Sequence, residues 1–291
     1  NGQWNWETLK QICAAVRDTT DSDPNMHTYA LCYTNEPYLE TAAIFSNNGR
    51  FIEVEGSARL LRYEVIHTDA PVNSTFESTD INLKWLYDAF INTQLCNMHA
   101  GIPSDCPHLE RRVYTGDGEL ACDAAMETLD AKAFYAKWIE DIADCQDRVS
   151  GHIQYTAPYV RSGGGPGGWG CAIVHVPYEF YKHYGDIGFM KKLYPQMKEY
   201  FRYLDDHSEN GLVVSDRAGE WCLGDWCVAR GARVKILIPE PFVNNYFYIK
   251  SLNEVLECAD AVGLSDNEKA ALADKKTALI KAVNDRYFDP E

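Results

Sequence analysis

The chain has 291 residues, of which 46% are hydrophobic and 12% aromatic, enough for a large core spread over roughly two domains. Its 27 Lys and Arg against 43 Asp and Glu give a formal net charge of -16, which repels phosphate backbones and anionic lipid surfaces. No apolar run approaches the roughly 20 residues of a membrane helix. We therefore expect no nucleic acid partner and no membrane association.

The first 78 residues are expected to be rich in β-strands. Strand-like runs occupy 40–45, 50–54 and 60–67, and the Asn-Asn-Gly sequence at 47–49 is typical of a hairpin turn between two of them. We interpret residues 1–78 as the end of a β-sandwich domain. Ser78 and Asp80 are capping residues that precede a helical pattern, so the domain boundary is predicted there.

Residues 79–291 are expected to form a mostly α domain. Apolar residues recur every three or four positions, and Ser265 with Glu268 forms a capping box ahead of the last helix. One apolar stripe contains Phe134, Trp138, Ile139 and Ile142, and a second contains Phe189, Leu193, Met197, Tyr200 and Leu204. The pattern predicts helices near 80–98, 118–128, 131–147, 170–184, 186–208, 240–261 and 265–286.

Three long segments between these helices are expected to be loops, at 99–117, 148–169 and 209–238. Long loops within a helical domain are uncommon and tend to be functional. If the helices form hairpins stacked side by side, long connections that alternate with short ones gather at one end. We therefore expect these three loops to form the walls of a cleft.

The first loop ends in a stretch rich in acids, with Asp105, Glu110 and Asp117 within thirteen positions. Pro107 and Gly116 argue that the whole stretch from 104 to 117 is not an ordinary helix. Hydrolysis of a glycosidic bond needs one protonated carboxyl and one carboxylate, and a cluster of acids can raise the pKa of one member. The alternative is structural: Arg111 and Arg112 pair with these acids and fasten the loop.

Two further loop segments combine glycine, acid and tryptophan. The run from Arg161 to Trp169 has five glycines but no Gly-Lys-Ser, so it does not predict a phosphate loop. Trp169 is either a ring that faces a sugar or a hydrophobic plug. Gly-acid-Trp occurs twice between 219 and 226, and an acid beside an indole, as in Asp225-Trp226, suits sugar binding.

The sequence predicts neither a metal site nor a cofactor. The ten cysteines show no disulfide framework or recurrent C-x-x-C pattern, so free thiols are expected. His175 and His183 are eight positions apart on one expected helix, and we interpret them as core or surface histidines rather than ligands. No G-x-S-x-G motif points to a nucleophilic serine.

These motifs together resemble bacterial α-L-rhamnosidases of glycoside hydrolase family 78. Asp-Cys-Pro at 105–107, Glu-Arg at 110–111 and Tyr-Thr-Gly-Asp at 114–117 are similar to that family's signature. Further matches follow in the family's order, from Phe76 to Tyr287: Asp141 to Gln146, Ala157-Pro158, Gly168 to Gly170, Val176-Pro177, Tyr184 to Asp186 and Gly224 to Trp226.

The resemblance implies an (α/α)6 barrel preceded by β-sandwich domains, and an inverting hydrolase that releases non-reducing terminal L-rhamnose from glycosides or polysaccharides. Glu110 matches the family's general acid. The substrate-binding residues expected around it are Asp105, Arg111, Tyr114, Asp117, Trp169, Asp225 and Trp226. Tyr114 stands where the family usually has Trp, and Cys171 stands where Asp is common, so the sugar could differ.

The family's general base is a glutamate expected downstream of Glu291, and the seven helices are too few to close a barrel. We therefore expect residues 79–291 to be the first helices of an incomplete barrel that does not hydrolyse rhamnosides alone. Two alternatives stay open: a glycosidase of the same fold that acts on another sugar, and a non-catalytic carbohydrate-binding scaffold. A bacterial periplasmic or secreted location is favoured, and a homo-oligomer stays open.

Overall fold

The computed structural model describes residues 67–106, 110–160, 163–217, 222–225 and 238–288. The chain divides into two units, Asn1–His67 with Cys106–Arg111, and Thr68–Asp105 with Arg112–Glu291. The strands and the hairpin predicted before residue 67 lie outside the described residues. The β-sandwich interpretation and the boundary at residue 78 therefore stay predictions.

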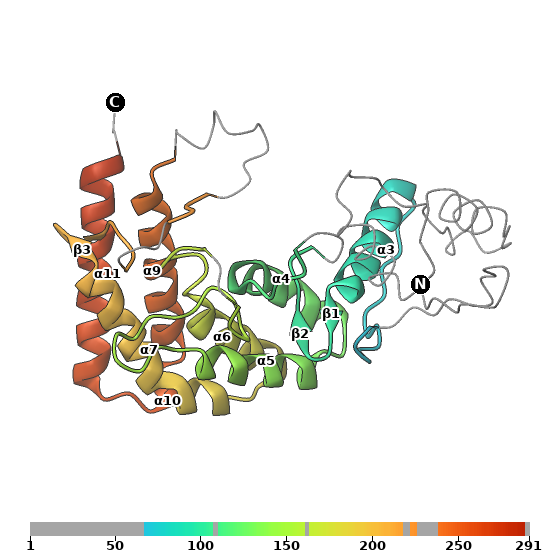
Figure 1. Cartoon of the computed structure of the whole chain (residues 1–291). Coiled ribbons are helices and arrows are strands. Elements are labelled where there is room, and N and C mark those ends of the chain that lie inside the picture. Colours follow the sequence, from blue (N-terminus) through green and yellow to red (C-terminus); the bar gives the residue numbers. More distant parts are fainter. Residues whose placement is uncertain (1–66, 107–109, 161–162, 218–221, 226–237, 289–291) are drawn as a thin grey trace, which may run out of the picture. The chain divides into compact units, whose positions relative to one another are not determined.

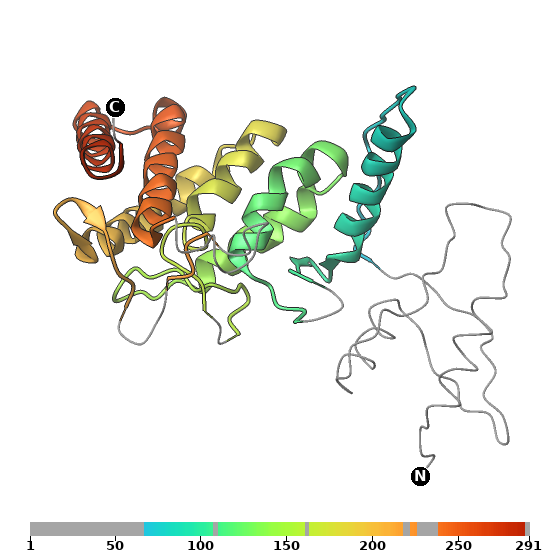
Figure 2. The ribbon, with the colours of Figure 1, turned by 90° about the horizontal axis from the view of Figure 1, so that it is seen from above.

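The second unit is built from helices that follow one another side by side in chain order, as Figure 2 shows. Its central helix, α6, packs against α4, α5, α7 and α9, and α9 packs against α11 (Figure 1). The helices are α3 (Ile81–Cys96), α4 (Thr115–Thr128), α5 (Lys132–Asp144), α6 (Ala172–Tyr184), α7 (Gly188–Asp206), α9 (Glu240–Glu257), α10 (Ala259–Val262) and α11 (Asp266–Tyr287). This confirms a mostly α fold, and the described helices form an open row rather than a closed barrel.

Strands are short in the described part of the chain. β1 (Met98–His99) pairs antiparallel with β2 (Ile102–Pro103), with Met98 opposite Pro103. β3 (Ser208–Glu209) pairs in the same way with β4 (Leu212–Val213). Both pairs are small hairpins at the end of a helix, and they turn the chain into the loop that follows.

The apolar stripes predicted from the helical period form the core. Trp138, Ile139 and Ile142 are buried on α5, and Met197 and Tyr200 are buried on α7. All five belong to one hydrophobic cluster, because residues three and four positions apart share a helix face. The periodicity therefore identified the correct face of both helices.

Helix ends follow local sequence signals. Asp80 caps α3, because its Oδ1 accepts a hydrogen bond of 2.8 Å from the amide of Asn82. Ser265 and Glu268 form the expected capping box of α11. Gly185 ends α6 in the left-handed conformation with φ 67°, which glycine adopts without strain. No helix among the described residues has both the length and the apolar content to cross a membrane.

The start of α4 corrects one expectation. The stretch 104–117 was expected to be non-helical, with the helix beginning near 118, but α4 begins at Thr115 and includes Gly116 and Asp117. Tyr114 has an extended backbone and is the last residue of the loop. The Asp117 carboxylate in the first turn stabilises the helix, because it lies near the positive end of the helix dipole. Pro107 and Gly116 therefore do not keep the whole stretch out of a helix, because its last three residues lie beyond the proline.

The three long loops come together within the second unit. Tyr114 in the first loop forms an antiparallel bridge with Thr156 in the second. Gly164 in the second loop forms a parallel bridge with Cys222 in the third. The expectation that long connections gather is therefore confirmed at these bridges. The seven described cysteines form no disulfide with one another.

Candidate active site

The entry into α4 is held by the second loop. The amide of Thr115 donates to the carbonyl of Tyr155 at 3.0 Å, and the amide of Ala157 donates to the carbonyl of Val113 at 3.0 Å. These two bonds flank the bridge between Tyr114 and Thr156. Backbone hydrogen bonds on both sides of Tyr114 therefore hold its backbone in position.

Four residues from the three loops form a small apolar group, which we call the ring cluster: Tyr114, Tyr155, Trp169 and Leu223. Trp169 is 9% exposed and Tyr114 is half-buried, so part of an aromatic surface stays open to solvent. Aromatic rings that are open on one side and anchored on the other suit stacking against the apolar face of a sugar. Tyr155 was not predicted as a site residue.

Glycines let the backbone approach these rings closely. A Cβ at Gly116 would lie 2.8 Å from Nε1 of Trp169, and a Cβ at Gly164 would lie 2.4 Å from Cγ of Tyr155. The amide of Leu223 donates to the carbonyl of Gly164 at 2.8 Å. These glycines therefore serve close packing in the ring cluster, in agreement with the absence of a phosphate-loop motif.

A buried carboxylate anchors Tyr155. Asp216 has a side chain only 1% exposed and accepts short hydrogen bonds from the hydroxyls of Tyr155 and Tyr203. The amide of Arg217 also donates to Asp216 Oδ1, at 2.8 Å. Nε2 of His152 lies 3.8 Å from the same oxygen. We call these residues, His152, Tyr155, Tyr203 and Asp216, the loop cluster.

Burial sets the ionisation of the loop cluster. Burial first, and then the nearby positive charge of Arg217, lower the pKa of His152 to about 4, although Asp216 opposes this change. Burial raises the pKa of the Tyr155 hydroxyl well above its usual value, and the Asp216 charge raises it further. Tyr155 therefore keeps its proton and donates a hydrogen bond to Asp216, which holds the ring in place.

A second group of buried polar residues, the helix cluster, lies between α4, α6 and α9. It contains Glu119, His175, Lys250 and Glu254. Nδ1 of His175 lies 2.6 Å from Glu254 Oε1, and its Nε2 lies 3.5 Å from Glu119 Oε2. Nζ of Lys250 lies 3.2 Å from His175 Nε2 and 4.0 Å from Glu119 Oε2.

Glu119 holds a proton near neutral pH. Its side chain is 0% exposed, and burial raises its pKa to about 7, against the opposing charges of His175 and Lys250. Burial raises the pKa of the Cys171 thiol well above its usual value, and the nearby charge of Glu119 raises it further. Cys171 follows Trp169 by two residues, so the end of the second loop lies close to both the helix cluster and the ring cluster.

The helix cluster was largely missed in the sequence. His175 was interpreted as a core or surface histidine, and it is indeed buried, but its partners Glu119 and Glu254 lie 56 and 79 positions away. The one local signal was that Glu119 lies on the same expected helix as buried apolar residues. A charged residue on a buried face indicates that it has a partner, but it does not identify that partner.

The predicted binding acids occupy different settings. Asp105 closes its own loop, because its amide donates to the carbonyl of Arg112 and its Oδ1 accepts from the amide of Arg112, each at 2.9 Å. Asp117 is exposed on the first turn of α4, and Asp225 is half-buried after Gly224, which has φ 60°. The structural alternative, in which Arg111 and Arg112 pair with these acids and fasten the loop, stays a prediction. Trp226 lies outside the described residues.

Glu110 and Arg111 belong to the first unit of the chain. Glu110 is exposed. Arg111 has φ 51°, and its amide donates to the carbonyl of Cys106 at 3.3 Å. The role of Glu110 as general acid and of Arg111 as a substrate ligand therefore stay predictions.

Residues 71–291 match the family model described as the bacterial alpha-L-rhamnosidase 6 hairpin glycosidase domain. An alpha-L-rhamnosidase of Formosa agariphila is 28% identical over 264 residues, which cover 84% of this chain and 27% of that protein. One of Streptomyces avermitilis is 32% identical over 201 residues, which cover 67% of this chain and 19% of that protein. The chain thus spans about a quarter or less of the length of these relatives.

Solved structures agree with this match. The crystal structure of the Streptomyces avermitilis alpha-L-rhamnosidase complexed with L-rhamnose has a TM-score of 0.68 at 28% identity, over 78% of this chain and 21% of that one. The Dictyoglumus thermophilum alpha-L-rhamnosidase has a TM-score of 0.66 at 22% identity, over 81% of this chain and 26% of that one, and supports the fold alone. The chain belongs to the family of bacterial alpha-L-rhamnosidase six-hairpin glycosidase domains.

Proposed function

We propose that the protein to which this chain belongs is an inverting α-L-rhamnosidase that releases non-reducing terminal L-rhamnose from glycosides or polysaccharides. The observation that supports this most is the family match over residues 71–291, together with the likeness to the Streptomyces avermitilis alpha-L-rhamnosidase complexed with L-rhamnose. The ring cluster is compatible with it, because L-rhamnose has an apolar face and a methyl group that can stack on Tyr114 or Trp169.

In the proposed reaction Glu110 is the general acid. Its carboxyl donates a proton to the glycosidic oxygen while the bond from that oxygen to the anomeric carbon breaks. A water molecule attacks the anomeric carbon from the opposite face and gives its proton to a general base, which inverts the configuration. We expect that base to be a glutamate downstream of Glu291. Asp105, Asp117 and Asp225 are proposed ligands of sugar hydroxyls, and Arg111, Trp169 and Trp226 are further proposed substrate-binding residues.

The test is Glu110→Gln in the full-length protein, assayed with two rhamnosides. A sugar or alkyl leaving group needs protonation, whereas 4-nitrophenolate leaves with little help. We expect kcat of the variant to fall at least about 100-fold on a natural disaccharide and much less on 4-nitrophenyl rhamnoside. In the wild-type protein, NMR should show that the rhamnose first released has the anomeric configuration opposite to that of the substrate. Equal losses on both substrates would remove Glu110 from the acid role.

The matched control is Glu209→Gln, since Glu209 is an exposed carboxylate on β3 within the same chain. It should leave both rates unchanged. If wild-type protein binds L-rhamnose but turns over neither substrate, the non-catalytic scaffold is the better description.

A second candidate keeps the mechanism and changes the sugar. The observation in its favour is that the Cys171 thiol is buried near Glu119, at a position where the family commonly has Asp. Unpaired polar groups in a pocket reject a wrong sugar strongly. A panel of 4-nitrophenyl glycosides decides the question: a higher kcat/KM for another sugar than for L-rhamnose would favour this candidate.

A further inference from the structure

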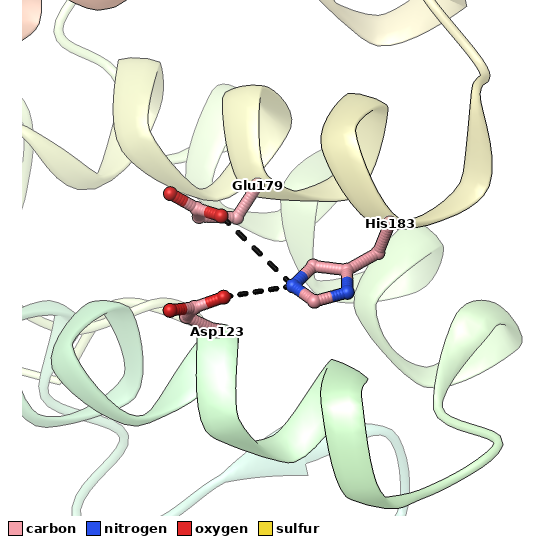
Figure 3. A group of neighbouring side chains, drawn as sticks. All are labelled: Asp123, Glu179 and His183. Carbon is pink, nitrogen blue, oxygen red and sulfur yellow. Dashed lines mark hydrogen bonds and ion pairs between the residues drawn. The ribbon is translucent and has the colours of Figure 1, made fainter.

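A group of three potential ligands lies on the helix pair α4 and α6. Figure 3 shows Asp123 on α4 and Glu179 and His183 on α6, with both carboxylates directed toward the same imidazole nitrogen. Nε2 of His183 lies 2.8 Å from Asp123 Oδ1 and 4.0 Å from Glu179 Oε2, and the three ligand atoms all lie within 4.8 Å of one another. We propose that Asp123, Glu179 and His183 bind a divalent zinc-like metal ion.

The distances suit a metal with short bonds. Zinc binds imidazole nitrogen and carboxylate oxygen at about 2.0–2.2 Å, so two ligand atoms of a tetrahedral site are about 3.3 Å apart. The present separations of 2.8 and 4.0 Å lie on either side of that value. Small rotations of the Asp123 and Glu179 side chains therefore suffice, and neither helix has to move.

The other nitrogen of His183 supports the same assignment. Its Nδ1 lies 3.6 Å from Oε2 of Glu127, which is one helical turn beyond Asp123 on α4. A carboxylate that accepts a proton from one ring nitrogen fixes the tautomer in which the other nitrogen has a free lone pair. In the structure the proton lies on Nε2, which donates to Asp123 Oδ1, and Nδ1 is beyond hydrogen-bond distance of Glu127. A metal ion at Nε2 would require the proton to be on Nδ1 instead, where Glu127 is the nearby acceptor.

Glu179 is the buried member of the site. Its side chain is only 6% exposed, and it lies between two histidines, since Oε1 is 4.0 Å from Nδ1 of His175 while Oε2 faces His183. In the structure the Glu179 carboxylate is paired with Lys182, whose Nζ donates a hydrogen bond of 3.2 Å to Glu179 Oε2. Lys182 is about half-exposed, so its ammonium can move into solvent when a metal ion takes over the neutralisation of Glu179.

The ligand types select the class of metal. One imidazole and two carboxylates suit Zn²⁺ or Co²⁺, whereas Mg²⁺ and Ca²⁺ prefer oxygen alone and Cu⁺ prefers thiolate. The sequence contains the matching pattern, because Glu179 and His183 are four positions apart on α6 and Asp123 and Glu127 are four positions apart on α4. This departs from the expectation that His183 is not a ligand.

The site is structural in character. Asp123 lies nine residues after Tyr114, about 13 Å along the axis of α4 from the ring cluster. A metal bound there would join α4 to α6, and since it binds only the folded protein it would raise the unfolding temperature. The proposal is therefore independent of the glycosidase assignment.

The test titrates the full-length protein, stripped with EDTA and dialysed, with Co²⁺ and then with Zn²⁺. Visible absorption of Co²⁺ reports nitrogen and oxygen ligands, and calorimetry with Zn²⁺ counts the sites. We expect His183→Gln to have one zinc site fewer than the wild-type protein. The rise in unfolding temperature that zinc causes in the wild-type protein should also be absent in this variant. Glu127→Gln should keep the site but weaken it about 10-fold.

His99→Gln is the matched control, since His99 is a half-buried histidine whose Nε2 contacts the carbonyl of Cys96, and it should leave zinc binding unchanged. Asp123→Asn is the second variant, because the Asp123 side chain is 62% exposed and its replacement does not endanger folding. It should weaken binding at least about 10-fold. An equal number of sites with equal affinities in wild-type protein and both ligand variants, or no zinc binding by wild-type protein, would overturn the proposal.

Discussion

The helix cluster and the loop cluster bury polar groups in two different ways next to the same rings. The helix cluster places Lys250 and His175 among carboxylates, and burial still raises the pKa of Glu119 to about 7. The loop cluster surrounds the single carboxylate of Asp216 with two hydroxyls and an amide. The first depends on charge balance, and the second depends on hydrogen-bond donors.

The two clusters should therefore respond oppositely to pH. Glu119 has a folded pKa of about 7 against 4.5 when unfolded, so the stability it contributes is complete below pH 4.5 and is lost as the pH rises to about 7. His152 has a folded pKa of about 4 against 6.5, so its contribution grows over pH 4 to 6.5. Between about pH 4.5 and 6.5 the contributions of Glu119 and His152 to stability therefore change in opposite directions.

Glu119→Gln breaks this balance and should have the largest effect. The variant lacks the contribution of Glu119, which decreases as the pH rises. Its free energy of unfolding should therefore rise by about 3 kcal/mol more between pH 4.5 and 7 than that of the wild-type protein does. Urea denaturation at four pH values measures the difference. Parallel stability curves for the two proteins would show that Glu119 does not hold a proton in the folded state.

Lys250→Met tests charge balance in the helix cluster directly. Removing one partner of a buried ionic group leaves the others uncompensated, and because Lys250 is 28% exposed we expect a loss of about 2–3 kcal/mol rather than the full buried cost. Lys281→Met is the control, since Lys281 pairs with Asp285 on the exposed face of α11 and should cost under about 1 kcal/mol. Equal losses would argue against an ionic role for Lys250.

Asp216→Asn tests the loop cluster. The amide keeps the shape but weakens the bonds from Tyr155 and Tyr203, so we expect a loss of about 2 kcal/mol at pH 7. Tyr203→Phe removes only one of these bonds and should cost about 1 kcal/mol. A double-mutant cycle measures the coupling, and additive losses would mean that Asp216 and Tyr203 act independently. The affinity for sugar should also fall in Asp216→Asn, because Tyr155 belongs to the ring cluster.

Gly116→Ala should have the smallest effect on stability. Alanine favours the helix, but its Cβ would lie 2.8 Å from Nε1 of Trp169 and must displace that ring, for a net loss of about 1 kcal/mol. Tryptophan fluorescence and L-rhamnose affinity should both change. Gly188→Ala, at the start of α7, is the control, since a Cβ there would meet the exposed Asp186 carboxylate rather than Trp169. Unchanged rhamnose affinity in Gly116→Ala would separate Trp169 from sugar binding.

The helices could be predicted from the sequence because their signals are local. The stripe of Trp138, Ile139 and Ile142 repeats at the helical period, and the capping box of Ser265 and Glu268 joins residues three positions apart. The start of α4 was misplaced by three residues, because Pro107 and Gly116 suggested a longer loop. Local rules describe helix interiors better than helix ends.

The sequence by itself determined the helical class, the buried faces and, through the order of its motifs, the family. Only the tertiary structure decided which side chains meet. Tyr155 and Asp216 are 61 positions apart, and His175 and Glu254 are 79 apart, yet each pair shares one hydrogen bond. The physical reason is that periodicity assigns a residue to a face, whereas its partner depends on how helices and loops pack around the whole core.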